Sequence, residues 1–268
     1  MLRLPEALVK LDDHQLHGQF IIATFRAWQF YPLAHPQQSI DDAIEHFRIS
    51  KDPEGEAQLH IVVGQYYLRI GNIAQAENFY RRAVSLAAQC NSDLHVWGTY
   101  GLATTQWARG NYSEGLRLAR ETYKMGVIRG DFRAQSNGMR HQALCYKGLG
   151  DFKHTLQVVK EGKELLALAG MQGGAGENMF MNTEANVYKL KGEYTAARQI
   201  HETILHQTSS TLSPLQHGYA LLNLASIDIV SGASIEVVSR NLTIALSLFK
   251  QLQHARGVSA CEHLSEKS

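Results

Sequence analysis

Proline is scarce in this sequence and unevenly placed. Three of the five prolines, Pro5, Pro32 and Pro36, lie within the first 36 residues, which leaves only Pro53 and Pro214 in the rest of the chain. Proline breaks helix interiors because it lacks a backbone N–H group and its ring clashes with the preceding turn. Long uninterrupted helices are therefore compatible with almost the whole chain beyond residue 36.

Cysteine, excess charge and long apolar runs are scarce as well. The three cysteines are odd in number and far apart, which excludes a disulfide framework or a CxxC metal pair and fits a reducing compartment. The 26 basic and 25 acidic residues give a net charge of +1, so the chain as a whole does not attract nucleic acid or an anionic membrane. No run approaches the ~18 apolar residues of a membrane span, and the first residues lack the apolar core of a signal peptide. The sequence predicts a cytoplasmic protein with no membrane partner.

A short glycine-centred motif recurs along the chain. A glycine followed by a polar residue and then an apolar one appears as GNI, GNY, GDF and GEY, with a weaker copy, GAS, at the end. The five glycines are Gly71, Gly110, Gly150, Gly192 and Gly232, spaced 39 to 42 residues apart. A period of this length is typical of stacked repeat architectures.

Other positions keep a fixed distance from these glycines. The residue four before the glycine is tyrosine in three of the five copies, and the residue five after it is small in four. The residue seven before is small every time: Gly64, Ala103, Ala143, Ala185 and Ala225. Glycine can end a helix in the left-handed conformation, and small residues let two helices approach closely. The pattern predicts antiparallel helical hairpins that stack to bury their apolar faces.

We expect six hairpins and one further segment within a single repeat domain covering residues 1–268. A less regular hairpin precedes the five glycine units, with Ser39 as the expected N-cap of its second helix. Asp52-Pro53 and Ser213-Pro214 are helix-start signals between units. The expected hairpins span about 14–52, 53–92, 93–130, 131–170, 176–210 and 213–253, and residues 254–268 form a cap helix or the start of a truncated repeat.

The combination of small residue, tyrosine, turn glycine, aromatic residue and alanine resembles the tetratricopeptide repeat. It is clearest around Gly71 and Gly192, whereas Gln106, Asp228 and Ser234 depart from it. The usual unit has about 34 residues, and the longer units here resemble those of multidomain signal-transduction ATPases and regulators. HEAT and armadillo repeats share the period but do not account for the glycine corner. The resemblance implies an all-α, right-handed α-solenoid.

The same resemblance implies that the first helix of each hairpin lines a concave groove. The groove positions carry aromatic residues towards the N-terminal half and amide and cationic residues further along. They are Arg69, Trp97, Tyr100, Trp107, Asn137, Arg140, Lys147, Asn182, Asn186 and Lys189. Amide and cationic donors suit an extended peptide, an acidic one in particular. The alternative is that the aromatic residues are core and the cations are solvated helix ends.

Signals for catalysis or cofactor binding are weak. The glycine-rich segment 170–178 lacks the Lys-Ser/Thr of a phosphate-binding loop and is expected to be an inter-hairpin loop. His14 and His17 have no third metal ligand nearby in the sequence, His201 falls at a core position, and Cys145 faces the repeat packing. We therefore expect no catalytic residue, metal or cofactor.

The interpretation that these observations favour is a protein-interaction or scaffold module that binds a protein or peptide. The alternatives are an accessory or sensor domain of a multidomain ATPase, a peptide-signal receptor, and a hydrolase with an unrecognised site. Nucleic acid is disfavoured as a partner, because no first-helix position repeats a base-reading set. The sequence leaves the oligomeric state open.

Overall fold

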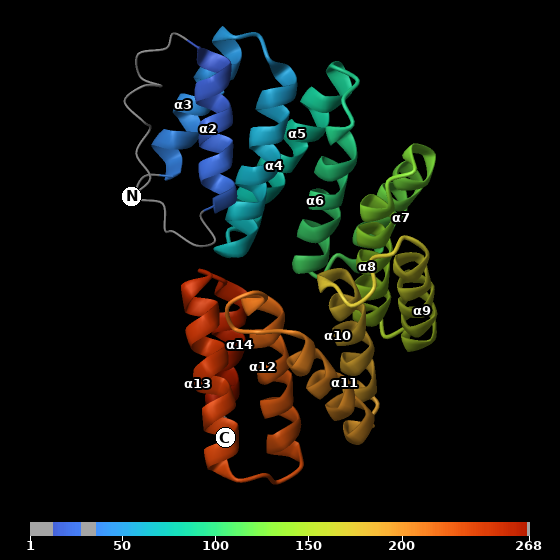
Figure 1. Cartoon of the computed structure of the whole chain (residues 1–268). Coiled ribbons are helices and arrows are strands. Elements are labelled where there is room, and N and C mark those ends of the chain that lie inside the picture. The colour runs from blue at the N-terminus through green and yellow to red at the C-terminus, as the bar shows by residue number, and fades with distance from the viewer. Residues whose placement is uncertain (1–12, 28–35, 267–268) are drawn as a thin grey trace. The chain divides into compact units, whose positions relative to one another are not determined.

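The computed structural model describes residues 13–27 and 36–266, which contain thirteen α-helices and no strand (Figure 1). The prediction of an all-α fold is confirmed. The helices are α2 (His14–Ala27), α3 (Pro36–Ile49), α4 (Pro53–Arg69), α5 (Ile73–Gln89), α6 (Leu94–Ala108), α7 (Tyr112–Arg129), α8 (Phe132–Gly148), α9 (Phe152–Leu168), α10 (Ala175–Leu190), α11 (Tyr194–Gln207), α12 (Pro214–Val230), α13 (Ile235–Gln251) and α14 (Ala255–Ser265). The connection expected around Pro32 lies outside the described residues.

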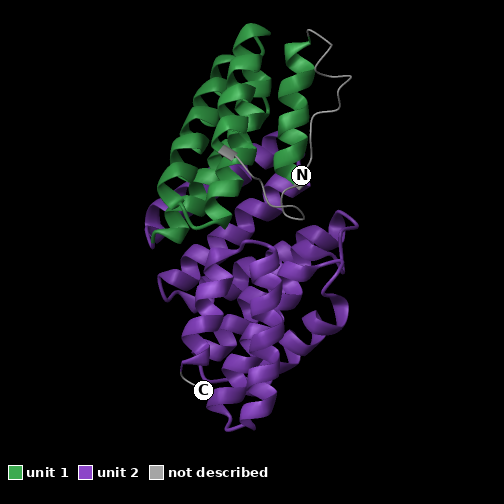
Figure 2. Ribbon diagram, turned by 90° about the vertical axis from the view of Figure 1, so that its left-hand side faces the viewer, with its two compact units in different colours: residues 1–109 green, residues 110–268 purple. Residues whose placement is uncertain are grey.

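The chain divides into two compact units, residues 1–109 and 110–268, coloured separately in Figure 2. Unit 1 contains α2 to α6 and unit 2 contains α7 to α14. The division falls at Gly110, one of the five repeat glycines. A single repeat domain over the whole chain remains a prediction, and each unit is described below by itself.

The five repeat glycines end helices in the predicted way. All five have positive φ angles, between 69° and 85°. At Gly150, the glycine N–H donates to the carbonyl of Lys147 and the Asp151 N–H donates to the carbonyl of Tyr146. These bonds satisfy carbonyl groups that the helix end leaves unpaired. The carboxylate of Asp151 accepts a hydrogen bond from the His154 N–H and so caps the next helix. The glycine thus ends one helix, and the polar residue after it caps the start of the next.

Small residues in the first helices make room for large aromatic rings. In unit 1, a Cβ atom built on Gly101 would lie 2.2 Å from the ring of Tyr80, and one on Gly64 would lie 2.8 Å from it. Tyr80, on α5, is therefore enclosed by α4 and α6 and is only 2% exposed. In unit 2 the roles are reversed, because Gly162 on the second helix α9 accommodates the ring of Phe180 on the first helix α10. The small positions are packing requirements of these rings.

Two helix starts differ from the expectation. α3 begins at Pro36, so Ser39 lies inside the helix; proline is well tolerated at a first helical position because the N–H it lacks would have no partner there. After Gly232, α13 begins at Ile235, one residue later than in the other units. The buried position therefore shifts from Val237, which is exposed, to Val238, which is 2% exposed.

The residues that depart from the tyrosine position form polar links between hairpins. Gln106 donates to the carboxylate of Glu77 on the preceding second helix. Asp228 pairs with Arg198 on the preceding second helix of its own unit. Glu77 and Arg198 each lie six residues after a repeat glycine, so the two links join equivalent positions. The departures thus replace an aromatic contact by a buried polar one.

The first helices of successive hairpins lie next to each other within each unit. In unit 1, α2 contacts α4 and α4 contacts α6; in unit 2, α8 contacts α10, α10 contacts α12 and α12 contacts α14. We call these surfaces the first-helix face of each unit. The final helix, α14, continues the series in unit 2 and packs against α13 as well.

Candidate functional site

The first-helix face of unit 1 carries the predicted aromatic residues. Trp97 and Tyr100 on α6 are half-buried, and their rings meet edge to face with centroids 6.1 Å apart. Trp107 is also half-buried and lies ten residues further along α6, about 15 Å away along the helix axis. Arg69 ends α4, and burial lowers its pKa. Trp97 and Tyr100 therefore contact each other. Trp107 lies nearer the end of α6, and Arg69 is the last residue of α4.

The first-helix face of unit 2 brings four of its polar residues into a hydrogen-bonded network (the amide–lysine network). The amide of Asn223 on α12 donates to the side-chain oxygen of Asn182 on α10 at 3.1 Å. The Asn223 oxygen in turn accepts from Nζ of Lys189 at 3.1 Å, and Ser226 Oγ lies 3.4 Å from the same nitrogen. Asn223 is buried, with 8% of its surface exposed. The network thus holds the Lys189 ammonium group between α10 and α12 through bonds to neutral oxygen atoms.

Lys147 lies at the same repeat position on α8 that Lys189 occupies on α10, three residues before the turn glycine. Burial, reinforced by the positive charges of Arg256 and Lys189, lowers the pKa of Lys147 to about 8. Burial also lowers the pKa of Lys189. Within the part of the chain that the structure describes, neither lysine forms an ion pair with a carboxylate. The two ammonium groups therefore carry charge that this face does not neutralise.

The remaining predicted residues of unit 2 are less closely joined. Asn186 donates to the backbone carbonyl of Asn182, so its amide turns back onto its own helix. Arg140 on α8 lies beside His141, whose pKa burial and that guanidinium lower well below its usual value. Asn137 is half-buried one turn earlier on α8. These residues share the face but not the amide–lysine network.

Sequence reasoning missed Asn223, Ser226 and Arg256. Ser226 lies six residues before Gly232, just as the predicted groove residue Asn186 lies six residues before Gly192. Extending that spacing to the fifth glycine would have found it. Asn223 lies at a different spacing from its glycine, and no repeat glycine follows Arg256 on α14. Their contribution to this face comes from packing between hairpins.

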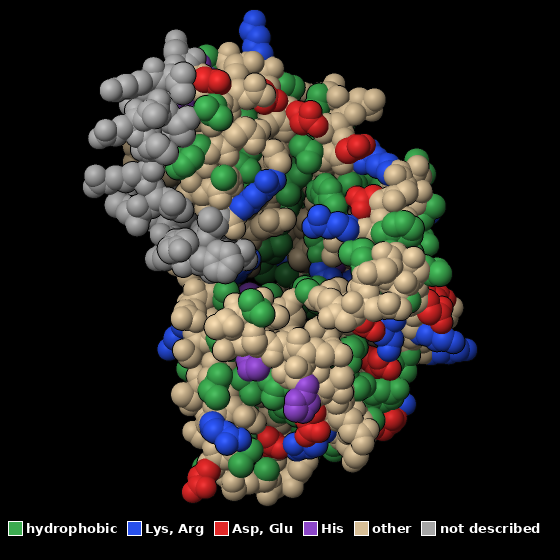
Figure 3. All heavy atoms as spheres, in the orientation of Figure 1, with side chains coloured by type: hydrophobic (Ala, Val, Ile, Leu, Met, Phe, Trp, Pro, Cys, Tyr) green, Lys and Arg blue, Asp and Glu red, His purple; other side chains and the backbone are tan. Residues whose placement is uncertain are grey.

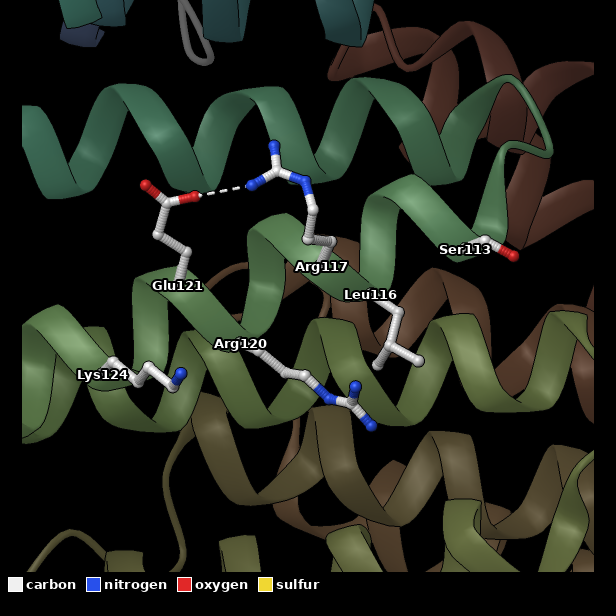
Figure 4. A pocket seen from close by; sticks show the side chains of 6 residues that line it. All are labelled: Ser113, Leu116, Arg117, Arg120, Glu121 and Lys124. Atoms are coloured by element: carbon white, nitrogen blue, oxygen red, sulfur yellow. Dashed lines mark hydrogen bonds and ion pairs between the residues drawn. The ribbon is translucent and has the colours of Figure 1, made fainter.

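A shallow hollow of about 410 Å³ lies elsewhere, along one helix of unit 2. Figure 4 shows that its lining residues come from successive turns of α7: Ser113, Leu116, Arg117, Arg120, Glu121 and Lys124. Arg117 is ion-paired with Glu114 and Glu121. Cationic and anionic side chains are interspersed on the visible face of each unit in Figure 3. Its central arginine is already paired with carboxylates of its own helix, so Arg117 is not available as a charge for a ligand.

The structure also tests the weaker chemical signals. The Cys145 thiol is fully buried, and burial raises its pKa to about 12, so it is not an activated nucleophile. His201 is fully buried, which confirms its prediction as a core residue. The glycine-rich segment is only partly the predicted loop, because residues 170–174 lie between α9 and α10 whereas residues 175–178 form the first turn of α10.

The structure brings a third histidine to His14 and His17. His46 on α3 stacks on His17 and contacts His14, with 2.8 Å between the two Nδ1 atoms. In the described ranges, however, these rings and the other His, Cys, Asp and Glu side chains contain no group of three arranged to hold a metal ion. The three rings form part of the contact between α2 and α3.

Comparison with known proteins agrees with this architecture. Residues 57–90 match the tetratricopeptide repeat family model. The fold is that of tetratricopeptide-like helical repeat proteins. Among solved structures, the apo form of RapI covers 94% of this chain and 99% of its own, with a TM-score of 0.65 and 11% identity. A Rap protein complexed with competence and sporulation factor covers 98% of this chain and 91% of its own, with a TM-score of 0.58 and 13% identity.

A third similar structure is a signal-transduction ATPase with numerous domains and a tetratricopeptide repeat sensor, from Pyrococcus horikoshii. It has a TM-score of 0.59 and 11% identity, and the match covers 96% of this chain but 42% of that protein. At these identities the likeness shows the fold alone. No curated protein matches the chain. No described helix has the length and apolar character needed to cross a membrane.

Proposed function

We propose that this protein is a non-catalytic, cytoplasmic interaction module whose first-helix faces bind an extended segment of a partner protein or peptide. The amide–lysine network is the observation that carries the proposal. It joins Asn182 and Lys189 on α10, which the family resemblance assigns to the groove, to Asn223 on the adjacent first helix, α12. Amides can bond a peptide backbone, and ammonium groups can pair with its acidic side chains.

Charge favours an acidic segment as the ligand. Lys147 and Lys189 lie on the face of unit 2 without a carboxylate partner among the described residues, and Arg140 adds a third cation on α8. A buried ammonium group without a carboxylate partner costs less when a ligand supplies the opposite charge. Trp97, Tyr100 and Trp107 give the face of unit 1 an apolar character suited to large side chains.

The test is affinity capture of partners from source cells with the full chain. Replacing Arg140, Lys147 and Lys189 together by Glu should abolish capture of the specific partner, while circular dichroism shows unchanged helicity. The matched control replaces Lys153, Lys160 and Arg240, exposed cations on second helices, by Glu. Partner capture that survives the first triple variant would contradict the proposal for unit 2. Trp97→Ala with Trp107→Ala tests unit 1 in the same way.

A sensor role is the second candidate function, and the fold likeness to a Rap protein complexed with competence and sporulation factor and to a protein with a tetratricopeptide repeat sensor supports it. A sensor must change conformation when its ligand binds. Small-angle scattering of the full chain should then show a smaller radius of gyration after addition of the captured peptide. An unchanged radius at saturating peptide would leave the simple interaction module as the function.

A further inference from the structure

Three histidine rings meet where α2 packs against α3 in unit 1. His14 and His17 lie at the start of α2, and His46 lies in the last turn of α3. The His46 ring stacks on that of His17 with the ring centroids 4.8 Å apart, and its Nδ1 atom lies 2.8 Å from Nδ1 of His14. All three side chains are partly buried. We call these residues the histidine cluster; the proposed function does not involve them.

The contact between His14 and His46 requires that one of the two facing nitrogens is unprotonated. A neutral imidazole has one donor and one acceptor nitrogen, whereas both nitrogens of a protonated imidazole are donors. When both residues are protonated, the two Nδ1 atoms can no longer share a hydrogen bond, and two positive charges lie side by side. Protonation of both His17 and His46 likewise places like charges on stacked rings, which disfavours the charged forms.

The helices are packed closely beside the histidine cluster. Gly18 follows His17 and lies against the ring of Phe47, which follows His46; a Cβ atom built on Gly18 would be 2.4 Å from that ring. A Cβ atom built on Gly55 of α4 would also be 2.4 Å from it, and Phe47 is only 1% exposed. Phe47 is thus enclosed by α2 and α4. Repulsion within the cluster therefore acts directly on the contact that holds α2 in place.

The surrounding charged groups act on His46 in both directions. Burial, followed by the charges of His17 and His14, lowers the pKa of His46 from its usual value of 6.5. Asp42 and Glu45, on the same helix, act in the opposite direction but do not outweigh these causes. The nearby carboxylates at the starts of α2 and α4 form bonds of their own: Asp13 accepts from the Leu16 N–H, Asp52 from Gln15 and Gly55, and Glu54 from Ser92, and Glu56 pairs with His60.

The sign of the pH effect follows from this balance. His46 is harder to protonate while α2 is packed against it than after α2 has moved away, so protons bind preferentially to the chain with α2 released. The contribution of the neutral ring to the α2 contact is fully present above about pH 6.5 and is lost as the pH falls below that value.

We propose that the histidine cluster is an acid-sensitive contact, which holds α2 against α3 and α4 at neutral pH and releases it when the rings become protonated at mildly acidic pH. Release uncovers the apolar residues that α2 buries, namely Ile21, Ile22 and Phe25, together with the part of the core that they cover. Because α2 also contacts α4, the next first helix, its release changes the first-helix face of unit 1. This inference does not depend on the proposed function.

Amide hydrogen exchange of the full chain, followed by mass spectrometry at pH 7.5 and pH 5.5, tests the proposal without any ligand. Each rate is divided by the intrinsic rate at the same pH. Protection of α2 should fall by about three- to tenfold at pH 5.5, because uptake of one proton changes an equilibrium by at most about tenfold per pH unit. Protection of α5, which packs on α4 and α6, should stay the same.

Two results of this measurement would overturn the proposal. An equal loss of protection in α5 would mean that unit 1 unfolds as a whole. Unchanged protection of α2 would mean that the protonated rings turn into solvent while the helix stays in place.

Variants show whether the histidine cluster causes the pH response. His46→Gln removes the central ring, so the ratio of α2 protection at the two pH values should approach one, even where the variant weakens the contact at both. His17→Gln keeps the His14–His46 bond and should remove part of the response. The matched control is His206→Gln, at an exposed position on α11, which should keep the full response. A full response in both cluster variants, or its loss in His206→Gln, would overturn the proposal.

Discussion

Glu77 of unit 1 and the two lysines Lys147 and Lys189 of unit 2 show opposite treatment of buried charge. In unit 1, the carboxylate of Glu77 is 8% exposed and accepts bonds from Arg81, Arg109 and Gln106, with both arginine contacts at 2.6 Å. In unit 2, Lys147 and Lys189 are partly buried without a carboxylate partner among the described residues. A charge that its own fold neutralises stabilises the structure, whereas one that the fold leaves unneutralised is available to a ligand.

The largest expected effect is on the packing that supports the aromatic face of unit 1. Gly101→Ala places a Cβ atom 2.2 Å from the buried Tyr80 ring, and we expect a loss of about 3 kcal/mol in the free energy of unfolding. Urea denaturation followed by circular dichroism measures it. The control is Gly174→Ala, since its nearest neighbour is a carbonyl oxygen 3.6 Å away. Equal stabilities of the two variants would show that the Tyr80 ring can move.

Removal of the neutralised charge in unit 1 should also destabilise the chain. Glu77→Ala deprives Arg81 and Arg109 of their common partner, and because both arginines remain partly exposed, we expect a loss of about 2 kcal/mol. The same denaturation experiment measures it, with Glu114→Ala, at an exposed ion pair, as control. A Glu77→Ala variant as stable as the control would contradict the expectation that the neutralised charge of Glu77 stabilises the fold.

Removal of the unneutralised charge in unit 2 should have the opposite sign. Folding lowers the pKa of Lys147 from 10.5 to about 8, so the protonated lysine opposes folding. That penalty is fully present below pH 8 and disappears as the pH rises towards 10.5. We expect Lys147→Met to raise the free energy of unfolding at pH 7 by about 1 kcal/mol.

The gain from Lys147→Met should shrink between pH 8 and pH 10.5, because the wild-type lysine becomes neutral in the folded state over that range. Denaturation curves of the variant and the wild type at pH 7 and pH 10 measure the difference. Lys153→Met, at an exposed position, should show no such change with pH. A destabilised Lys147→Met variant at pH 7 would mean that an internal partner neutralises this lysine.

The smallest effect is expected on α7. Arg117 pairs with Glu114 and Glu121, but its side chain is 60% exposed. Solvent-exposed pairs contribute little, so Arg117→Ala should change the free energy of unfolding by less than about 0.5 kcal/mol. Thermal denaturation at low and high salt measures this contribution. A loss above about 1 kcal/mol would mean that the exposed ion pairs of Arg117 stabilise the chain in the way expected for the ion pairs of Glu77.

The fold was predictable because its signals are local. A turn glycine, the polar residue after it and a small residue seven positions earlier all lie within one hairpin, so their spacing appears directly in the sequence. The shift at Val238 was not predictable, because the helix starts of the other units gave no sign that α13 begins one residue later. Gln106 and Asp228 looked like degraded repeat positions until their partners on the preceding helices were known.

The candidate site was predictable only in part. The repeat offsets located Lys147, Asn182 and Lys189 on the first helices, since a residue's place on a helix follows from its distance to the turn. They gave no information about contacts between helices about 40 residues apart, such as Asn223 with Asn182 and Lys189.

The sequence by itself determined the repeat, the corners and the helical hairpins, because helix ends and close packing depend on residue types at short separations. Only the tertiary structure decided which charges are neutralised. Glu77 and Lys147 look alike in the sequence, as charged residues within amphipathic helices. Their difference arises from the neighbouring hairpin, which supplies Arg109 and Gln106 to the first and the cation Lys189 to the second.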